Sequence, residues 1–166
     1  MFIPAVALAL LLRVPPALAV PDSTHCMDAA QFLREQQHMI TAIDPDTIDD
    51  WRSRTRVVSC RITAAGGTDI GVQGEAVRLY ERLRAAKWVR TPDPRDSPNE
   101  GSLRFRWNAS DCLFNVNREA LLGTEAEGRV NEALVLKPGD TRYQVFVMCL
   151  PVLPAAPRSP VASHAT

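Results

Sequence analysis

The stretch that decides the fold reads Ser102-Leu-Arg-Phe-Arg-Trp107, then Asn108-Ala-Ser-Asp111, then Cys112-Leu-Phe-Asn-Val-Asn117. In the first run three apolar side chains alternate with two arginines. In the second run the first, third and fifth residues form one apolar face. Alternation with a period of two is typical of a strand that buries one face. Because the residues between the runs suit a tight turn, we expect an antiparallel hairpin.

Three other segments also read as strands. Residues 56–63 alternate apolar and polar side chains, and Gly66-Gly67 is expected to end that strand. Residues 133–136 and 143–149 are expected to pair as a second hairpin. The sequence between them, Lys137-Pro-Gly-Asp140, has proline and glycine where a type II turn favours them.

Two segments have the apolar periodicity of helices, residues 27–40 and 73–87. On the second helix we expect Glu75 and Arg78 to pair on the solvent side, three residues apart. Asp44-Pro-Asp46 reads as an acidic turn, and Thr47 is placed to cap a helical turn over residues 47–51. Residues 118–131 read as a loop with a short helix. The apolar stripe of the second helix consists of Val72, Ala76, Leu79, Tyr80, Leu83 and Ala86.

The order of these elements predicts the fold class. A parallel sheet needs a helix between most of its strands, and that spacing is absent here. We therefore expect an α+β domain with a mostly antiparallel sheet of four to five strands and two helices on one face. The other face should be open and polar. Its candidate residues are Arg61, Thr63, Arg104, Arg106, Asn115, Asn117 and Gln144.

The chain contains four cysteines, Cys26, Cys60, Cys112 and Cys149. The last three fall on the apolar faces of predicted strands. No two are close enough in sequence for a CxxC redox centre or a zinc knuckle. An even number suggests two disulfides in an oxidising compartment, with three possible connectivities. Of these we favour Cys26–Cys60 with Cys112–Cys149.

The first residues resemble an export signal. An apolar run over residues 1–12 is followed by Ala17-Leu18-Ala19, the small-x-small pattern that signal peptidase accepts, although no basic residue precedes the run. We therefore expect a signal peptide over residues 1–19, a single domain over 20–150 and a disordered tail rich in proline and alanine over 151–166. The expected location is the periplasm or the medium of a bacterium, with no stable membrane insertion after cleavage.

The composition of the chain argues against some classes of partner but does not identify one. Basic and acidic residues balance at 19 each, so nothing favours a nucleic acid or a membrane surface. All the basic residues except Lys87 and Lys137 are arginines, a bias typical of GC-rich bacterial coding. No known nucleophile or metal motif is present, and we expect no cofactor and no metal. The glycine-rich connection over residues 66–74 lacks the GxGxxG and GK[ST] spacings of phosphate-binding loops, so we interpret it as a flexible link.

Three hypotheses for function follow. The leading one is a non-enzymatic module that binds a protein or a small anionic ligand through Arg61, Arg104 and Arg106, because guanidinium groups grip carboxylates and phosphates. The second is a hydrolase-like or metal-dependent enzyme that uses His38 and the acidic segment Asp44–Asp50. This requires Asp49 and His38 to meet in one cleft. The third is a structural component of the cell envelope.

Overall fold

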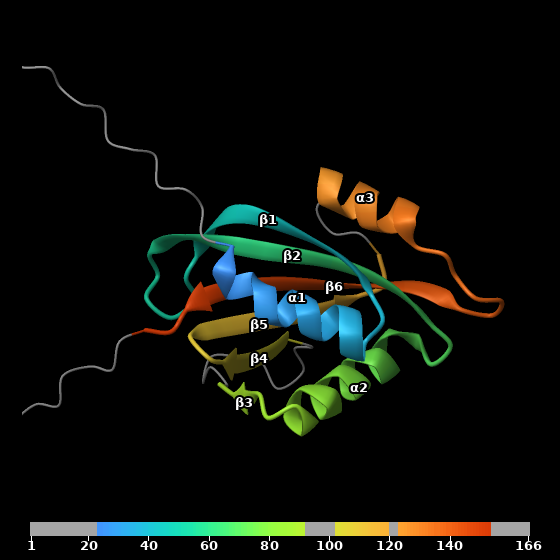
Figure 1. Cartoon of the computed structure of the whole chain (residues 1–166), viewed down its shortest axis with the longest axis horizontal. Helices are drawn as coiled ribbons and strands as arrows, with labels where there is room; N and C mark the ends of the chain where they lie inside the picture. Colours follow the sequence, from blue (N-terminus) through green and yellow to red (C-terminus); the bar gives the residue numbers. More distant parts are fainter. Residues whose placement is uncertain (1–22, 92–101, 120–122, 154–166) are drawn as a thin grey trace, which may run out of the picture.

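The computed structural model describes residues 23–91, 102–119 and 123–153, which form one antiparallel sheet with three helices (Figure 1). The predicted α+β class and antiparallel sheet are confirmed, but the sheet has six strands rather than four or five, and there are three helices rather than two. The predicted signal peptide and all but three residues of the predicted tail lie outside the described residues. Of those three, Pro151 belongs to the last strand.

The elements follow one another as helix, two strands, helix, three strands, helix and strand. The helices are α1 Thr24–Gln36, α2 Gly71–Ala85 and α3 Glu125–Ala133. The strands are β1 Ile40–Asp49, β2 Arg56–Thr68, β3 Val89–Arg90, β4 Ser102–Trp107, β5 Ser110–Asn117 and β6 Thr141–Pro151. Across the sheet the strands lie in the order β1-β2-β6-β5-β4-β3. Among the described helices, none is both long enough and apolar enough to cross a bilayer.

The hairpin predicted from residues 102–117 is β4 and β5. Trp107 lies opposite Ser110, so the connection has only two residues, Asn108 and Ala109. Asn108 has φ 50°, and two-residue hairpin loops favour residues that accept a positive φ. Phe105 and Phe114, one from each strand, are completely buried, which confirms the predicted apolar face.

The core lies between this apolar face and the helices α1 and α2; in Figure 1 α1 crosses in front of the sheet and α2 lies below it. Leu33 of α1 and Leu79 and Leu83 of α2 are buried against it. Trp88 joins the two layers, because its ring packs against Phe32 of α1, with centroids 5.9 Å apart, and against Phe114 and Trp107 of the sheet, at 5.7 and 5.8 Å. Aromatic pairs at this spacing add about 0.5–1.5 kcal/mol beyond their buried area.

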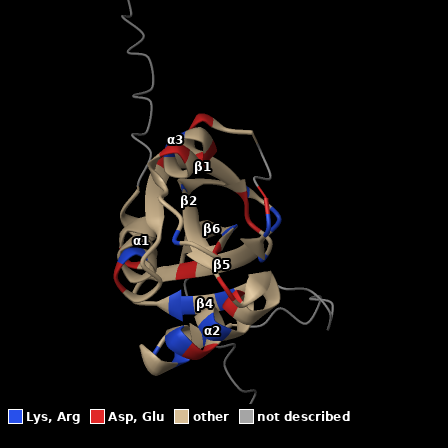
Figure 2. Ribbon diagram, turned by 90° about the vertical axis from the view of Figure 1, so that its right-hand side faces the viewer, with Lys and Arg blue, Asp and Glu red and all other residues tan. Residues whose placement is uncertain are grey.

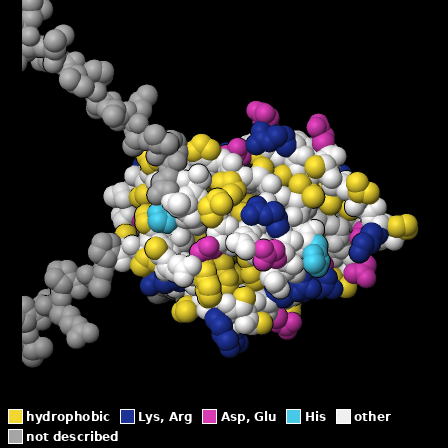
Figure 3. Space-filling view, viewed as in Figure 1, with side chains coloured by type: hydrophobic (Ala, Val, Ile, Leu, Met, Phe, Trp, Pro, Cys, Tyr) yellow, Lys and Arg dark blue, Asp and Glu magenta, His cyan; other side chains and the backbone are white. Residues whose placement is uncertain are grey.

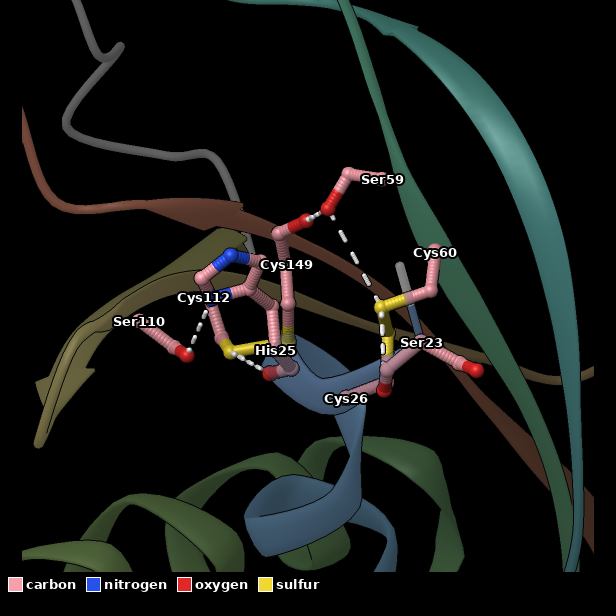
Figure 4. Close-up of a disulfide and its surroundings, with 8 residues drawn as sticks. All are labelled: Ser23, His25, Cys26, Ser59, Cys60, Ser110, Cys112 and Cys149. Carbon is pink, nitrogen blue, oxygen red and sulfur yellow. Dashed lines mark hydrogen bonds between the residues drawn. A yellow bond between two sulfur atoms is a disulfide. The ribbon is translucent and has the colours of Figure 1, made fainter. Parts of the chain in front are cut away.

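Two disulfides join the core elements at one end of the sheet (Figure 4). Cys26 of α1 is bonded to Cys60 of β2, and Cys112 of β5 to Cys149 of β6, the pairing favoured from the sequence. Cys149 lies directly opposite both Cys60 and Cys112, so three cysteines form one row across the sheet. Each bridge closes a loop of about 35 residues, which in the chain-entropy model stabilises the fold by about 3–4 kcal/mol. Disulfides of this kind indicate an oxidising environment.

Strand β1 corrects the prediction of an acidic turn and a helical turn over residues 44–51. The chain stays extended through Asp44, Pro45 and Asp46 up to Asp49. Proline cannot donate a ladder hydrogen bond, but β1 is an edge strand that pairs only with β2, and edge positions tolerate this loss. Charged residues and proline on an edge strand also discourage pairing with another chain.

Strand β2 continues through Gly66 and Gly67, which were expected to end it. The missing side chains make room for neighbours instead. A Cβ on Gly66 would lie 2.9 Å from the Tyr143 ring, and one on Gly67 would lie 2.8 Å from an oxygen of Asp140. The two glycines therefore allow close approach of these side chains rather than a break in the strand.

The predicted second hairpin is wrong, although its turn exists. Asp140 donates its amide to the Lys137 carbonyl and Gly139 has φ 90°, as a type II turn requires. However, residues 134–136 form no strand, and Val135 is 90% exposed. Strand β6 instead lies at the centre of the sheet, where β2 pairs with one of its edges and β5 with the other. The helix expected within residues 118–131 is α3, which begins later and extends to Ala133.

The second face of the sheet is not open as predicted. Arg129 of α3 forms an ion pair with Asp44, and Asn131 accepts a hydrogen bond from Gln144, so α3 contacts this face at one end. At the other end the segment between β1 and β2 folds back, and Arg52 reaches Asp111 of β5. Helices α1 and α2 therefore cover one face of the sheet, and α3 and the segment between β1 and β2 cover parts of the other. The predicted open face assumed only two helices, so it left these polar residues in contact with water.

Candidate functional site

The three arginines singled out from the sequence do lie on one face. Arg61 of β2 and Arg104 of β4 occupy the same row across the sheet, with Met148 and Leu113 between them. Three strand spacings of about 4.8 Å separate their backbones by about 14 Å. Arg106 lies two residues further along β4 on the same face.

Each of these arginines already has a partner within the protein. Arg106 donates two hydrogen bonds to the Asp111 carboxylate, at 2.6 and 2.9 Å, and these bonds raise the pKa of its guanidinium. Arg61 lies 3.3 Å from Asp46 and over the Phe146 ring. The guanidinium of Arg104 lies 5.1 Å from the centre of the Trp51 ring. A ligand on this face would have to compete with these internal contacts.

The acidic segment and His38 are not brought together. His38 comes before β1 and Asp49 ends it, so about nine residues of extended chain at about 3.3 Å each hold them about 30 Å apart. The cleft that the enzyme hypothesis requires is therefore not formed. Within the three described ranges, no group of three or more histidine, cysteine, aspartate or glutamate residues is arranged to hold a metal ion.

Asp50, the last residue of that segment, is instead a structural anchor. Its side chain is 1% exposed and accepts hydrogen bonds from the Arg52 side chain, the Arg52 amide and the Ser53 hydroxyl. Burial alone would raise the pKa of this carboxyl, but the Arg52 and Ser53 bonds together with the Arg52 charge lower it to about 2. The bonded carboxylate orders the connection between β1 and β2.

A polar pocket of about 350 Å³ lies at the end of the sheet where β2 leaves and β6 enters, on the right in Figure 1. Side chains of both charges and a histidine also gather on the right of the face in Figure 3, and α2 carries basic and acidic residues (Figure 2). The pocket is lined by the residues after α1, the end of β2, one side of α2, the segment before β6 and its first residues. These residues are Gln37, His38, Gly67, Thr68, Asp69, Glu75, Arg78, Arg82, Leu134, Val135, Lys137, Asp140 and Tyr143.

Glu75 is the buried acid of this pocket, with 2% of its surface exposed. One of its carboxylate oxygens accepts hydrogen bonds from the Thr68 hydroxyl at 2.8 Å and from Arg78 at 2.9 Å. Burial, together with the charge and hydrogen bond of Glu75, raises the pKa of Tyr143, which therefore remains a protonated donor. The pair with Arg78 was predicted, but it was expected on the solvent side of the helix.

Several polar groups that line the pocket are available to a ligand. Arg78 uses one nitrogen to bind Glu75, and 40% of its side chain is exposed. Within the described part of the chain, the side chains of His38, Lys137 and Asp140 form no hydrogen bond or ion pair. A cavity of this size with a few converging polar groups is the usual form of a small-molecule site.

Sequence reasoning missed this pocket because its residues come from five separate segments. One local signal was available for Glu75. It lies three residues after Val72 and four before Leu79, so it belongs to the apolar stripe of α2 rather than to its solvent side. No protein-family model, curated protein or solved structure matches the chain. The pocket must therefore be interpreted from its own chemistry.

Proposed function

We propose that this protein is a non-enzymatic binding module, exported to the periplasm or the medium of a bacterium, that holds the anionic group of a small ligand in the polar pocket. The two disulfides and the signal-like residues 1–19 support export. The observation that carries the binding proposal is Arg78. Its guanidinium is oriented by a buried carboxylate while much of its side chain faces the cavity.

The contact with Glu75 fixes the position of Arg78 before any ligand arrives. A guanidinium presents five N–H donors in a plane, so one bond to Glu75 leaves other donors for a carboxylate or phosphate. Lys137 lines the same cavity and adds a second positive charge. Preorganised donors bind a ligand with a smaller loss of conformational entropy than mobile ones.

Binding is favoured over catalysis because the buried acid of the pocket is already engaged. A general base needs an oxygen within reach of the proton it removes. One Glu75 oxygen accepts bonds from both Thr68 and Arg78, and the carboxylate also bonds Tyr143. This network orients Arg78, which lines the pocket.

The chain offers a matched pair of variants for testing the proposal. Lys87 and Lys137 are its only lysines, both are exposed, and only Lys137 lines the pocket. We expect acetate, succinate and inorganic phosphate, titrated at constant ionic strength, to shift the backbone NMR signals of pocket residues. Lys137→Met should weaken the tightest of these complexes about 5–10-fold, as the loss of one charge contact predicts. Lys87→Met should change it less than twofold.

Two results would overturn this proposal. One is that none of the three anions shifts the pocket signals at about 50 mM. The other is that Lys87→Met weakens binding as much as Lys137→Met, because the effect would then reflect net charge rather than a site.

The arginine face is a second candidate, for a protein partner. Met148 lies between Arg61 and Arg104, Phe146 lies two residues away on the same face of β6, and both are half-buried. A surface of this mixed character is common in protein interfaces. If a partner docks there, the double variant Arg104→Ala/Arg106→Ala should fold normally and lose that partner in a pull-down from the native cells. Retention of the partner would remove this face from consideration.

A further inference from the structure

The charges around the polar pocket balance, which limits the kind of ligand that fits it. Besides His38, three basic and three acidic residues line the cavity. A ligand with only negative charge would meet the acidic side chains as well as the basic ones, and a purely cationic ligand would meet the arginines. The basic residues are Arg78, Arg82 and Lys137, and the acidic ones are Asp69, Glu75 and Asp140.

Three of these six charges already have partners. Glu75 is paired with Arg78 at 2.9 Å. Arg82 donates to the Gln36 carbonyl at the end of α1 and to the Gln37 side chain. Lys137, Asp69 and Asp140 are left, and none of these three side chains is bonded to a described residue. Asp69 is exposed to solvent, whereas Asp140 is half-buried, so we take Lys137 and Asp140 as the pair of opposite charges available to a ligand.

Lys137 and Asp140 are the first and last residues of one tight turn. The hydrogen bond from the Asp140 amide to the Lys137 carbonyl, 3.1 Å long, closes that turn and brings the two backbones close together. Even so, the two side chains do not form an ion pair. Their separation leaves a positive and a negative group to act on different parts of a ligand.

Asp140 also packs closely against the backbone of β2. Its carboxylate lies so close to Gly67 that a Cβ there would be 2.8 Å from one oxygen and 3.3 Å from the Asp140 Cβ. Only a glycine permits this approach. The half-buried carboxylate is therefore held against the pocket wall, where an ammonium group would provide the partner that the protein does not.

We infer that the ligand of the polar pocket is zwitterionic, with its carboxylate bound by Arg78 and Lys137 and its ammonium group bound by Asp140. Amino acids, ω-amino acids and short peptides belong to this class. A cavity of about 350 Å³ is near the lower end of the range for small-molecule sites, in keeping with such ligands. This inference rests on the proposed function, since it specifies the ligand of the same site.

The test compares acids that differ only in the amino group. Glycine, 4-aminobutyrate and 6-aminohexanoate are titrated into the full folded chain at pH 7, alongside acetate, butyrate and hexanoate, with pocket NMR signals as the readout. We expect the best amino acid to bind at least about tenfold more tightly than the acid of the same length. Asp140→Asn should reduce this preference to about twofold while leaving the affinity for the simple acid unchanged or higher.

The outcomes separate this inference from the proposed function. Equal binding of an amino acid and its matched acid would overturn the inference and leave the anion site standing. A preference that survives in Asp140→Asn would overturn the assignment of the ammonium group to Asp140. If no acid of either series binds, the proposed function fails and the inference fails with it. Asp140→Asn keeps the size of the side chain, and an unchanged amide spectrum outside the pocket shows that the variant is folded.

Discussion

Replacing Asp50 by asparagine should destabilise the protein in a way that depends on pH. The Asp50 carboxylate is almost fully buried and accepts three hydrogen bonds from Arg52 and one from the Ser53 hydroxyl. Asparagine has nearly the same shape but lacks the negative charge. The change therefore removes the electrostatic part of the anchor with little effect on packing.

The size of the effect follows from the pKa of Asp50. Burial opposes ionisation, yet the bonds from Arg52 and Ser53 lower the pKa from 3.8 to about 2. At about 1.4 kcal/mol for each pKa unit, this corresponds to roughly 2 kcal/mol of stability. Because the pKa is lower in the folded state, the contribution is complete above about pH 5 and is lost as the pH falls from 4 to 2.

The measurement is urea unfolding of the native chain and of Asp50→Asn at pH 7, 5, 3 and 2. We expect the variant to be less stable by roughly 2 kcal/mol at pH 7 and by less than about 0.5 kcal/mol at pH 2. Asp49→Asn is the control, because the neighbouring carboxylate is exposed and only 3.7 Å from the exposed Arg56, so its loss should change stability by less than about 0.5 kcal/mol. A penalty for Asp50→Asn that is the same at pH 2 and pH 7 would refute the electrostatic reasoning, as would equal effects of the two substitutions.

Three further substitutions test local features of the fold by urea unfolding at pH 7. Thr124→Ala removes the hydroxyl that accepts the Glu127 amide in the capping box of α3 and should lower the stability by about 1 kcal/mol. Thr124→Ser should restore most of this loss, and an unchanged stability of Thr124→Ala would mean that the cap is not formed. Lys87→Gly should stabilise the protein by about 0.5–1 kcal/mol, because this exposed residue has φ 68° just after α2, where glycine is unstrained; destabilisation would contradict that backbone conformation. Gly66→Ala should destabilise by about 1–3 kcal/mol, since the new Cβ would lie 2.9 Å from the Tyr143 ring; an unchanged midpoint would show that the ring is not held against β2.

The parts of the fold that the sequence predicts are those with strong local patterns. The hairpin of β4 and β5 combines strict alternation with a polar turn, and both signals lie within 16 residues of each other. Helix α2 was predicted because its apolar residues recur at helical spacing over four turns. Both elements form as expected, because local preference and tertiary packing agree there.

Strand β1 was missed because its local signals describe a turn. The sequence of Asp44, Pro45 and Asp46 disfavours a strand on its own. Pairing with β2 over ten residues and contact with α3 determine the outcome, and neither can be deduced from residues near Pro45. The same limit applies to β6, whose partners β2 and β5 are distant in sequence. Local patterns identify the extended segments but not which of them meet.

In the candidate sites, too, the local features could be predicted from the sequence and the long-range contacts could not. The shared face of Arg61, Arg104 and Arg106 followed from strand alternation, whereas their partners Asp46, Trp51 and Asp111 come from other elements. The polar pocket depends on the end of β2 meeting the turn before β6. No spacing within the chain encodes that meeting, because it results from the register of two strands about 80 residues apart.

The disulfides and the polar pocket lie at opposite ends of the same elements. Helix α1 has Cys26 near its start and Gln37 just after its end, and strand β2 has Cys60 before its middle and Thr68 at its end. About 16 Å of helix and about 26 Å of strand therefore separate the crosslinks from the pocket. Since α1 and β2 are bonded to each other at one end, they cannot slide independently, and the residues that they contribute to the pocket stay in fixed relation. In this pocket Glu75 orients Arg78, and Gly67 leaves room for the carboxylate of Asp140. Such an arrangement requires the side chains to be held in position to within about half an ångström. Covalent attachment of its walls provides that constraint in a domain whose core is otherwise small.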